Sequence, residues 1–289
     1  MLMKYFSTSV ALLLASLTVS GVSYSEDKST ILEGPYLGQM PPGLTPEVFA
    51  PGIISTPGWE YGVVFAPGMN EIYFIREVDL ETDPKQEFVV FENKNNRWHE
   101  RVISPRVGTP TLSPDGKIMY FGRSYKERTS SGWSEPKRLG PDFEDIRIMR
   151  VTASAKGTYV LDEAVNNSVL RYSRLVDGER EAPEPLPKVI NTGKYNAHPF
   201  IAPDESYIIW DGQRNSEVRN ADLFISFKQK DGTWGEAIKM GETINTEASE
   251  FAASVTPDGK YLFFNRKMGP GNPDTFWVDA QVIENFRPE

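Results

Sequence analysis

The chain has 289 residues, and 31 Lys and Arg stand against 40 Asp and Glu, which gives a formal net charge of -9 at pH 7. A field of this sign repels nucleic acids and anionic membrane surfaces, so nucleic-acid binding is not expected. The absence of cysteine excludes disulfides, a lipid-anchored cysteine and any thiol metal site.

The first residues have the layout of a secretory signal peptide. Lys4 precedes an apolar run from Val10 to Val19, and small residues follow up to Ser25. The run is shorter than the roughly 20 residues that a membrane-spanning helix needs, and no later segment reaches that length without charges. We therefore expect residues 1–25 to be removed on export, leaving a periplasmic or secreted protein without a membrane span.

A turn motif recurs along the rest of the chain. Its copies are APGMNEIYF, SPDGKIMYF, SAKGTYVL, APDESYIIW and TPDGKYLFF. Pro, Asp and Gly suit the turn of a β-hairpin, and β-branched or aromatic residues flank it. The second turn residues lie 47, 41, 48 and 54 residues apart, at Pro67, Pro114, Ala155, Pro203 and Pro257. Periods of about 40–50 residues with four strands each are typical of β-propeller blades.

Two further strands are expected after each hairpin. The third strand is predicted in QEFVVFENK, SVLRYSRLVDG, ADLFISFKQKDG and DTFWVDAQV. The fourth is predicted in RWHERVI, GWSEPKRLG and GTWGEAIKMG, which place Trp98, Trp133 and Trp234 in equivalent positions. Because these tryptophans recur in the same outer strand, we interpret them as packing between blades rather than as sugar-stacking platforms.

The last repeat lacks a fourth strand. The segment LTPEVFAPGIIS, residues 44–55, resembles the fourth-strand segments and is expected to supply it, which would remove the exposed edges of an open array. The sequence therefore predicts an all-β fold, a five-bladed β-propeller of four-stranded antiparallel blades closed by the N-terminal strand. We expect a leader at 26–43, a single propeller domain at 44–289 and almost no helix.

The repeats SPDGKIMYF, APDESYIIWD and TPDGKYLFFNR, together with GWSEPKRLG, resemble the WD-like propeller repeats of periplasmic TolB-type proteins. More narrowly, they are similar to small exported bacterial proteins built of such repeats. The resemblance covers residues 35–289 and departs from the family pattern where SAKG replaces the Pro-Asp-Gly turn. It implies the propeller fold and export. It implies no single activity, because the wider group includes partner-binding propellers and some pectin-fragment lyases.

Polar side chains are expected to gather in the central channel. The first strand of each blade lines this channel, and side chains two residues apart point the same way. Seven residues before the second turn residue lie Glu60, Val107, Ile148, Asn196 and Glu250. Five before it lie Gly62, Thr109, Arg150, His198 and Ala252. Because buried ionisable groups mark sites, the catalytic candidates are His198, Glu60, Glu250 and Arg150.

A collar of charged side chains is expected where the second strands return to the same face. Arg76, Arg123 and Arg266 lie nine residues after the second turn residue, with Asp211 and Arg214 near the equivalent place in the fourth blade. These five are the candidate ligand-binding residues for an anionic ligand. The alternative is a structural ring in which each arginine pairs with a carboxylate of the channel and joins neighbouring blades.

No metal site and no cofactor are expected. The two histidines, His99 and His198, are far apart in the sequence, and no thiol is present. No Asp-rich calcium loop, Gly-x-Ser-x-Gly motif or Gly-rich phosphate loop occurs.

Three functions remain open. We favour a non-catalytic binding protein that recognises an anionic small molecule, a glycan fragment or an envelope protein at the channel mouth. The second is a carbohydrate-active enzyme. It would be a lyase with His198 as the base and Arg150 or Arg266 stabilising the enolate, or a glycosidase that uses Glu60 and Glu250. The third is a scaffold in an envelope complex, whose channel groups satisfy one another.

Overall fold

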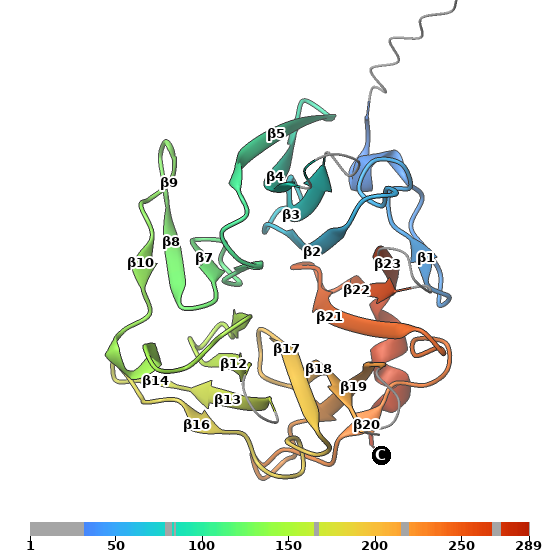
Figure 1. Ribbon diagram of the computed structural model, residues 1–289. Coiled ribbons are helices and arrows are strands. Elements are labelled where there is room, and N and C mark those ends of the chain that lie inside the picture. Colours follow the sequence, from blue (N-terminus) through green and yellow to red (C-terminus); the bar gives the residue numbers. More distant parts are fainter. Residues whose placement is uncertain are drawn as a thin grey trace, which may run out of the picture. The chain divides into compact units, whose positions relative to one another are not determined.

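The computed structural model describes residues 32–78, 83, 85–164, 168–214, 220–267 and 273–288. Leu32–Glu289 forms one compact unit. In its described part, five antiparallel sheets built on four strands each follow one another around a central axis, as the blades of a propeller (Figure 1). The predicted five-bladed architecture is confirmed. The predicted signal peptide at 1–25 and the start of the leader lie outside the described residues.

Each blade begins with an inner strand near the axis and ends with an outer strand. The first blade consists of β2 (Glu60–Phe65), β3 (Glu71–Val78), β4 (Lys85–Lys94) and β5 (Arg97–Pro105). The second consists of β6 (Pro110–Leu112), β7 (Ile118–Phe121), β8 (Ser124–Thr129) and β10 (Lys137–Arg138), with β9 (Gly132–Trp133) paired to β8. The third consists of β11 (Val151–Ala153), β12 (Tyr159–Glu163), β13 (Val169–Ser173) and β16 (Glu184–Pro185).

The remaining strands complete the ring. The fourth blade consists of β17 (Tyr195–Ile201), β18 (Tyr207–Gln213), β19 (Asp222–Phe227) and β20 (Ile238–Lys239). The fifth consists of β21 (Ser249–Val255), β22 (Tyr261–Lys267), β23 (Pro273–Asp279) and β1 (Glu47–Val48). A small hairpin is formed by β14 (Leu175–Val176) and β15 (Glu179–Arg180). Helix in the described part of the chain is limited to the 3-10 segments η1 (Pro35–Gly38), η2 (Pro141–Phe143) and η3 (Ala280–Phe286).

The N-terminal strand closes the ring. β1 pairs antiparallel with β23, so that Glu47 lies opposite Trp277 and Val48 opposite Phe276 (Figure 1). This confirms that the segment 44–55 supplies the outer strand of the last blade. Pairing of the two ends of the domain covers a sheet edge that would otherwise be open to another chain.

The apolar core lies mainly between neighbouring blades. Because each middle strand is covered on both faces, it reads as a continuous apolar run, and the residues of β3 from Ile72 to Ile75 are all buried. One cluster joins Tyr73 and Phe88 of the first blade to Met119 of the second. The packing interpretation of the outer-strand tryptophans is confirmed, since each lies in or against a cluster shared by two blades: Trp98, Trp133 and Trp234.

The described part of the leader packs against the propeller. Leu37 is buried in the core cluster shared by the first and fifth blades. The Gln39 amide donates to the Val48 carbonyl at 2.9 Å and accepts from the Ala50 amide at 2.6 Å. Residues 32–43 therefore fix the position of the closing strand.

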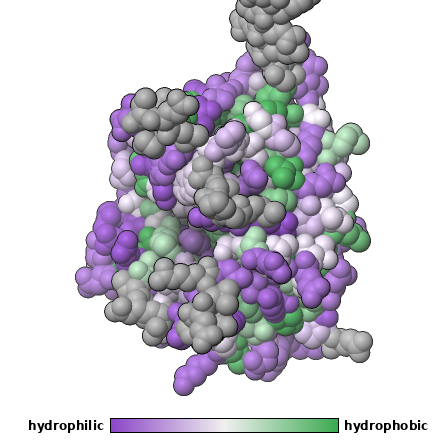
Figure 2. Space-filling model, turned by 45° about the vertical axis from the view of Figure 1, so that its right-hand side comes forward, coloured by the Kyte–Doolittle hydropathy of each residue, from purple (hydrophilic) through white to green (hydrophobic). Residues whose placement is uncertain are grey.

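The surface shown in Figure 2 is mostly hydrophilic, and its hydrophobic side chains form small separate patches. No helix within the described ranges is long and apolar enough to cross a membrane.

Phe49→Ala tests the closure. The Phe49 side chain is 0% exposed, and its ring packs edge to face on the Phe263 ring with 4.9 Å between the ring centres. We expect a loss of about 3–5 kcal/mol in the free energy of unfolding, because the truncation leaves a cavity beside the closing strand. Urea denaturation measures it. The control is Met40→Ala, at a side chain 81% exposed, which should change stability by less than about 0.5 kcal/mol. Equal effects of the two variants would contradict this role of the closing segment.

Candidate functional site

The inner strands of three blades carry a bulge near the axis. In β2, β17 and β21 the register with the second strand shifts, and Gly62, His198 and Ala252 take positive φ values of 69°, 45° and 56°. A bulge adds one residue, so side chains before and after it no longer alternate in a single phase. The two-residue count from the turn therefore does not hold through these strands, whereas β6 and β11 pair regularly.

The carboxylates that precede two of these bulges bind their own connecting segments. Thr56 Oγ1 donates to Glu60 Oε1 at 2.5 Å. Thr246 Oγ1 donates to Glu250 Oε1 at 2.6 Å, and Arg266 Nε donates to the same oxygen at 2.8 Å. Glu60 is 1% exposed and Glu250 0%. Burial raises the pKa of Glu60. Each carboxylate is thus held by the segment that leads into its own strand.

The connecting segments share a sequence signal that the turn repeat does not reveal. Ile54-Ser55-Thr56, Ile190-Asn191-Thr192 and Ile244-Asn245-Thr246 each lead into a bulged strand. The isoleucines are fully buried. The central Ser or Asn bonds to the backbone of the third strand in the blade just completed. The threonine ends the segment four residues before Glu60, Asn196 or Glu250, whose side chains bond back to it.

Two arginines of the expected collar are engaged in ion pairs. Arg76 pairs with Glu87 at 3.0 Å and with Glu100 at 2.7 Å, both on its own blade. Arg266 pairs with Glu250 at 2.8 Å. Arg266 thus pairs with a channel carboxylate, as the structural alternative expects, whereas Arg76 does not. Both sets of pairs lie within a single blade, so neither joins neighbouring blades.

The other two collar arginines differ in their surroundings. Arg214 Nη1 donates to the Thr192 carbonyl at 2.7 Å and to Asn196 Oδ1 at 3.0 Å, and burial lowers the pKa of Arg214 to about 10. Arg123 is exposed and donates from Nη1 to the Glu144 carbonyl. It makes no ion pair with any described residue, so its guanidinium is available at the surface.

His198, Asp211 and Arg150 meet near the axis together with Asp162. His198 Nδ1 lies 2.9 Å from Asp211 Oδ1. Asp162 accepts the His198 amide at 2.9 Å and the Arg150 amide at 3.0 Å. Arg150 Nη1 donates to the Ala253 carbonyl at 2.9 Å and to the His198 carbonyl at 3.4 Å. Ionisable groups of the third and fourth blades thus form one network that reaches the backbone of the fifth.

Burial and charge act against each other in this network. Arg150 is 2% exposed and Asp162 0%. Burial lowers the pKa of Arg150 and raises the pKa of Asp162. Burial by itself would lower the pKa of His198, but contact with Asp211 and the nearby charge of Asp162 outweigh it, so this pKa lies above its ordinary value. When His198 is protonated, the two cations and two anions balance.

A cavity of about 550 Å³ adjoins this network where the inner strands begin. We call it the mouth cavity, and its wall includes Trp59, Arg106, Arg123, Arg138, Ile148 and His198. Val107 and Thr109, two of the expected channel residues, also line it. No Asp or Glu is among its lining residues. On an acidic protein, this cavity is therefore lined by cationic, aromatic and aliphatic side chains.

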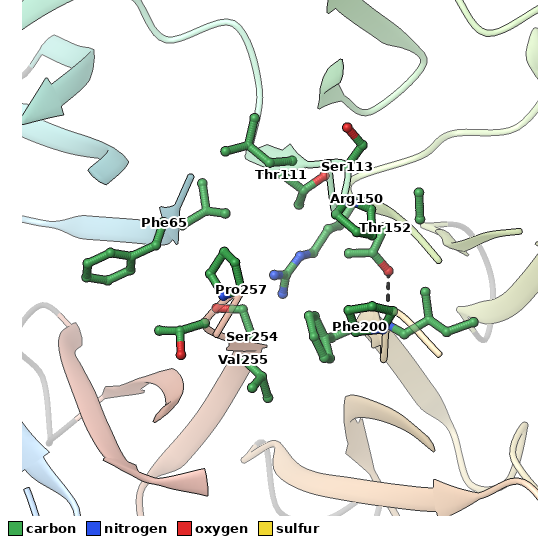
Figure 3. Close-up of a pocket in the computed structure, with 16 residues that line it drawn as sticks. Phe65, Thr111, Ser113, Arg150, Thr152, Phe200, Ser254, Val255 and Pro257 are labelled. Atoms are coloured by element: carbon green, nitrogen blue, oxygen red, sulfur yellow. Dashed lines mark hydrogen bonds between the residues drawn. The ribbon is translucent and has the colours of Figure 1, made fainter. Parts of the chain in front are cut away.

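A second cavity of about 170 Å³ lies at the end of the inner strands nearest the turns. We call it the axial cavity, and its wall includes Phe65, Thr111, Arg150, Thr152, Phe200 and Ser254. All five blades contribute to it. The Arg150 guanidinium points into its middle, between side chains of the other blades (Figure 3).

Sequence reasoning missed Trp59, Arg106, Arg138 and Asp162. Asp162 and Asp211 end the apolar runs TYVLD and YIIWD, and this shared ending was an available signal. Nothing comparable marks the two arginines, which reach the mouth cavity from the outer parts of their blades. Across the described ranges, no three His, Asp or Glu side chains are grouped as a metal site requires.

The raised pKa of His198 makes stability depend on pH. A basic group whose pKa is higher in the folded protein contributes stability that is complete below its unfolded pKa of about 6.5 and is lost as pH rises through the folded value. We expect the free energy of unfolding to fall over this interval. His198→Gln should remove this part of the slope, as measured by urea denaturation at a series of pH values.

The other histidine provides a matched control. His99 is exposed on β5, so His99→Gln should keep the wild-type pH dependence. An unchanged slope in His198→Gln would show that the contact with Asp211 does not favour the protonated imidazole.

Similarity to known proteins is found among solved structures. No protein-family model matches the chain, and no curated protein matches its sequence. TolB from Acinetobacter baumannii has a TM-score of 0.48 and 14% sequence identity, covering 76% of this chain and 54% of that one. The β-propeller domain of the Trilobed protease from Pyrococcus furiosus has a TM-score of 0.35 and 12% identity, covering 78% and 70%.

The catalytic domain of the GH62 alpha-L-arabinofuranosidase from Coprinopsis cinerea has a TM-score of 0.48 and 8% identity, covering 82% of this chain and 98% of that one. The chain spans about half the length of the TolB structure. The similar solved structures thus include TolB and other β-propeller proteins.

Proposed function

We propose that the chain is an exported β-propeller that binds an anionic ligand in the mouth cavity, namely a glycan fragment that carries carboxylates. One observation carries the proposal. Arg106, Arg123 and Arg138 line this cavity without any lining Asp or Glu, although the chain as a whole has a net charge of -9. A local excess of guanidinium groups on an acidic protein favours carboxylates, which guanidinium binds with paired hydrogen bonds.

The three arginines offer donors of different availability. Arg123 has no ion pair within the described part of the chain. Arg138 pairs with Glu144 at 2.6 Å, and Arg106 donates to Gln86 Oε1 at 2.8 Å. We therefore assign the main carboxylate contact to Arg123, with the other two adding positive charge at the rim.

The rest of the wall suits a sugar ring. Trp59 is partly buried and stacks on Tyr61 with 5.2 Å between ring centres, and the Arg106 guanidinium lies over its ring at 5.2 Å from the ring centre, so its orientation is fixed. Val107 and Ile148 add apolar surface. Sugar rings present both C–H faces and hydroxyls, and a volume of about 550 Å³ lies within the range of ligand pockets, about 300–1,000 Å³. An envelope protein, the other partner considered from the sequence, would need a broader surface than this concave site.

A lyase acting on the same ligand is the second candidate. His198 lines the mouth cavity and is oriented through Nδ1 by Asp211 at 2.9 Å. No hydrogen bond to a described residue occupies its Nε2, so this nitrogen has the placement of a general base facing a bound substrate. The base would remove a proton beside the carboxylate that Arg123 holds.

Arg123→Ala should weaken the binding of uronate oligosaccharides roughly tenfold or more, because it removes a charge-assisted hydrogen bond. Isothermal titration calorimetry measures this, with neutral oligosaccharides of the same length as the comparison. Trp59→Ala should weaken binding of the same ligands. The control is Arg101→Ala, at an exposed arginine of β5 that lines neither cavity.

Chromatography of the same mixtures separates the two candidates. Unchanged oligosaccharide supports a binding protein, and cleavage that His198→Ala abolishes supports the lyase. Equal affinity of the wild type and Arg123→Ala for the uronates would contradict both.

A further inference from the structure

The guanidinium of Arg150 keeps one complete edge free of protein acceptors. Of its five N–H donors, those of Nη1 bond to the carbonyls of Ala253 and His198. Nε is buried and has no hydrogen-bond partner, and no bond to a described residue is made by Nη2. The Nε and Nη2 hydrogens point along the same side of the planar group. This edge is the one that binds a carboxylate through two parallel hydrogen bonds.

No carboxylate of a described residue contacts the Nε and Nη2 edge of Arg150. Arg150 is 2% exposed and forms no ion pair with a described residue. Asp162 directs its oxygens to the amides of Met149, Arg150 and His198. Asp211 binds the His198 ring and the Ala252 amide. A buried cation with free donors is costly unless an anion or water satisfies them.

The axial cavity supplies room for such an anion but few other donors. Hydroxyls in its wall are already engaged, since Thr111 donates to the Val151 carbonyl, Thr152 to the Pro199 carbonyl and Ser254 to the Val63 carbonyl. Much of the remaining wall is apolar, with Val64, Leu112, Ala153, Phe200 and Val255. One charged fork in an otherwise mostly apolar wall selects a ligand with one carboxylate and a short apolar chain.

The size of the cavity limits the length of that chain. Its volume is about 170 Å³. A cavity of about 150 Å³ in another protein accommodates benzene, so this one holds a molecule of similar size. Three turn prolines, at positions 114, 203 and 257, border the cavity; the first is partly exposed and the other two are exposed, which gives a route of entry from the face that carries the turns.

We propose that the axial cavity is a second ligand site, distinct from the mouth cavity, which binds a short-chain monocarboxylate through the Nε and Nη2 edge of Arg150. The site lies on the propeller axis, where all five blades contribute wall. A bound carboxylate would make the third and fourth blades, which supply Arg150 and Phe200, share a ligand with the fifth, which supplies Ser254.

Calorimetric titration of the full chain with butyrate at constant ionic strength tests the proposal, with butyramide as a neutral molecule of the same shape. We expect saturable binding of butyrate, binding of butyramide at least tenfold weaker, and a shift of the Arg150 Nε–H resonance on addition of butyrate. Arg150→Met should abolish binding. Ala153→Leu leaves the guanidinium in place and fills the cavity, so it should abolish binding even if Arg150→Met fails to fold.

Arg123→Ala serves as the matched control for the other site and should leave butyrate binding unchanged. The proposal is overturned if no saturable binding of acetate, propionate or butyrate occurs in the millimolar range, or if butyramide binds equally well. It is also overturned if Ala153→Leu retains full affinity, or if Arg123→Ala abolishes binding, because the carboxylate would then occupy the mouth cavity.

Discussion

The arrangement at the axis depends on polar side chains that reach from the second strand of one blade to the inner strand of the next. Asp162 accepts the amide of His198, Asp211 accepts the amide of Ala252, and Asn265 donates to the Glu60 carbonyl. The two amides that donate to these carboxylates belong to bulge residues with positive φ. A bulge removes such an amide from the strand ladder, and a buried amide without an acceptor costs about 1–3 kcal/mol. The carboxylates therefore make these bulges tolerable.

The same contacts influence which side chains line the mouth cavity. The fourth, fifth and first blades each receive such a contact from the second strand of the blade before. The inner strands of these three blades are the bulged ones. Eight residues after the second turn residue, where Asp211 and Asn265 stand in their blades, the first and second blades hold Ile75 and Gly122, and the inner strands that follow them are regular. Just before the regular strands, Val107 and Ile148 line the mouth cavity, whereas Glu60 and Glu250 before the bulges do not. One interaction thus links the topology to the chemistry of the axis.

The architecture could be predicted from the sequence because turns, apolar runs and their period are local signals that are repeated five times. Closure was predictable for the same reason, since residues 44–55 resemble the other outer strands. The site was less accessible. His198 stands at the bulge of its strand and Arg150 just before a regular strand, and the count placed both near the axis, but it assumed unbroken alternation and did not foresee the bulges that follow Glu60 and Glu250. A bulge is a response to a partner on the neighbouring blade, and that partner, Asp162 for His198, lies 36 residues away in the chain.

The chain as a whole is acidic, but the walls of its two cavities carry cationic side chains. These opposite charges act over different distances. A net charge of -9 repels anions at long range, but at physiological ionic strength charges beyond about 8 Å are largely screened. The mouth cavity has Arg106, Arg123 and Arg138 in its wall, and in the axial cavity Arg150 supplies the charge. Attraction therefore acts only once a ligand has entered. For the proposed ligands, selection by these cavities rests on shape and paired hydrogen bonds.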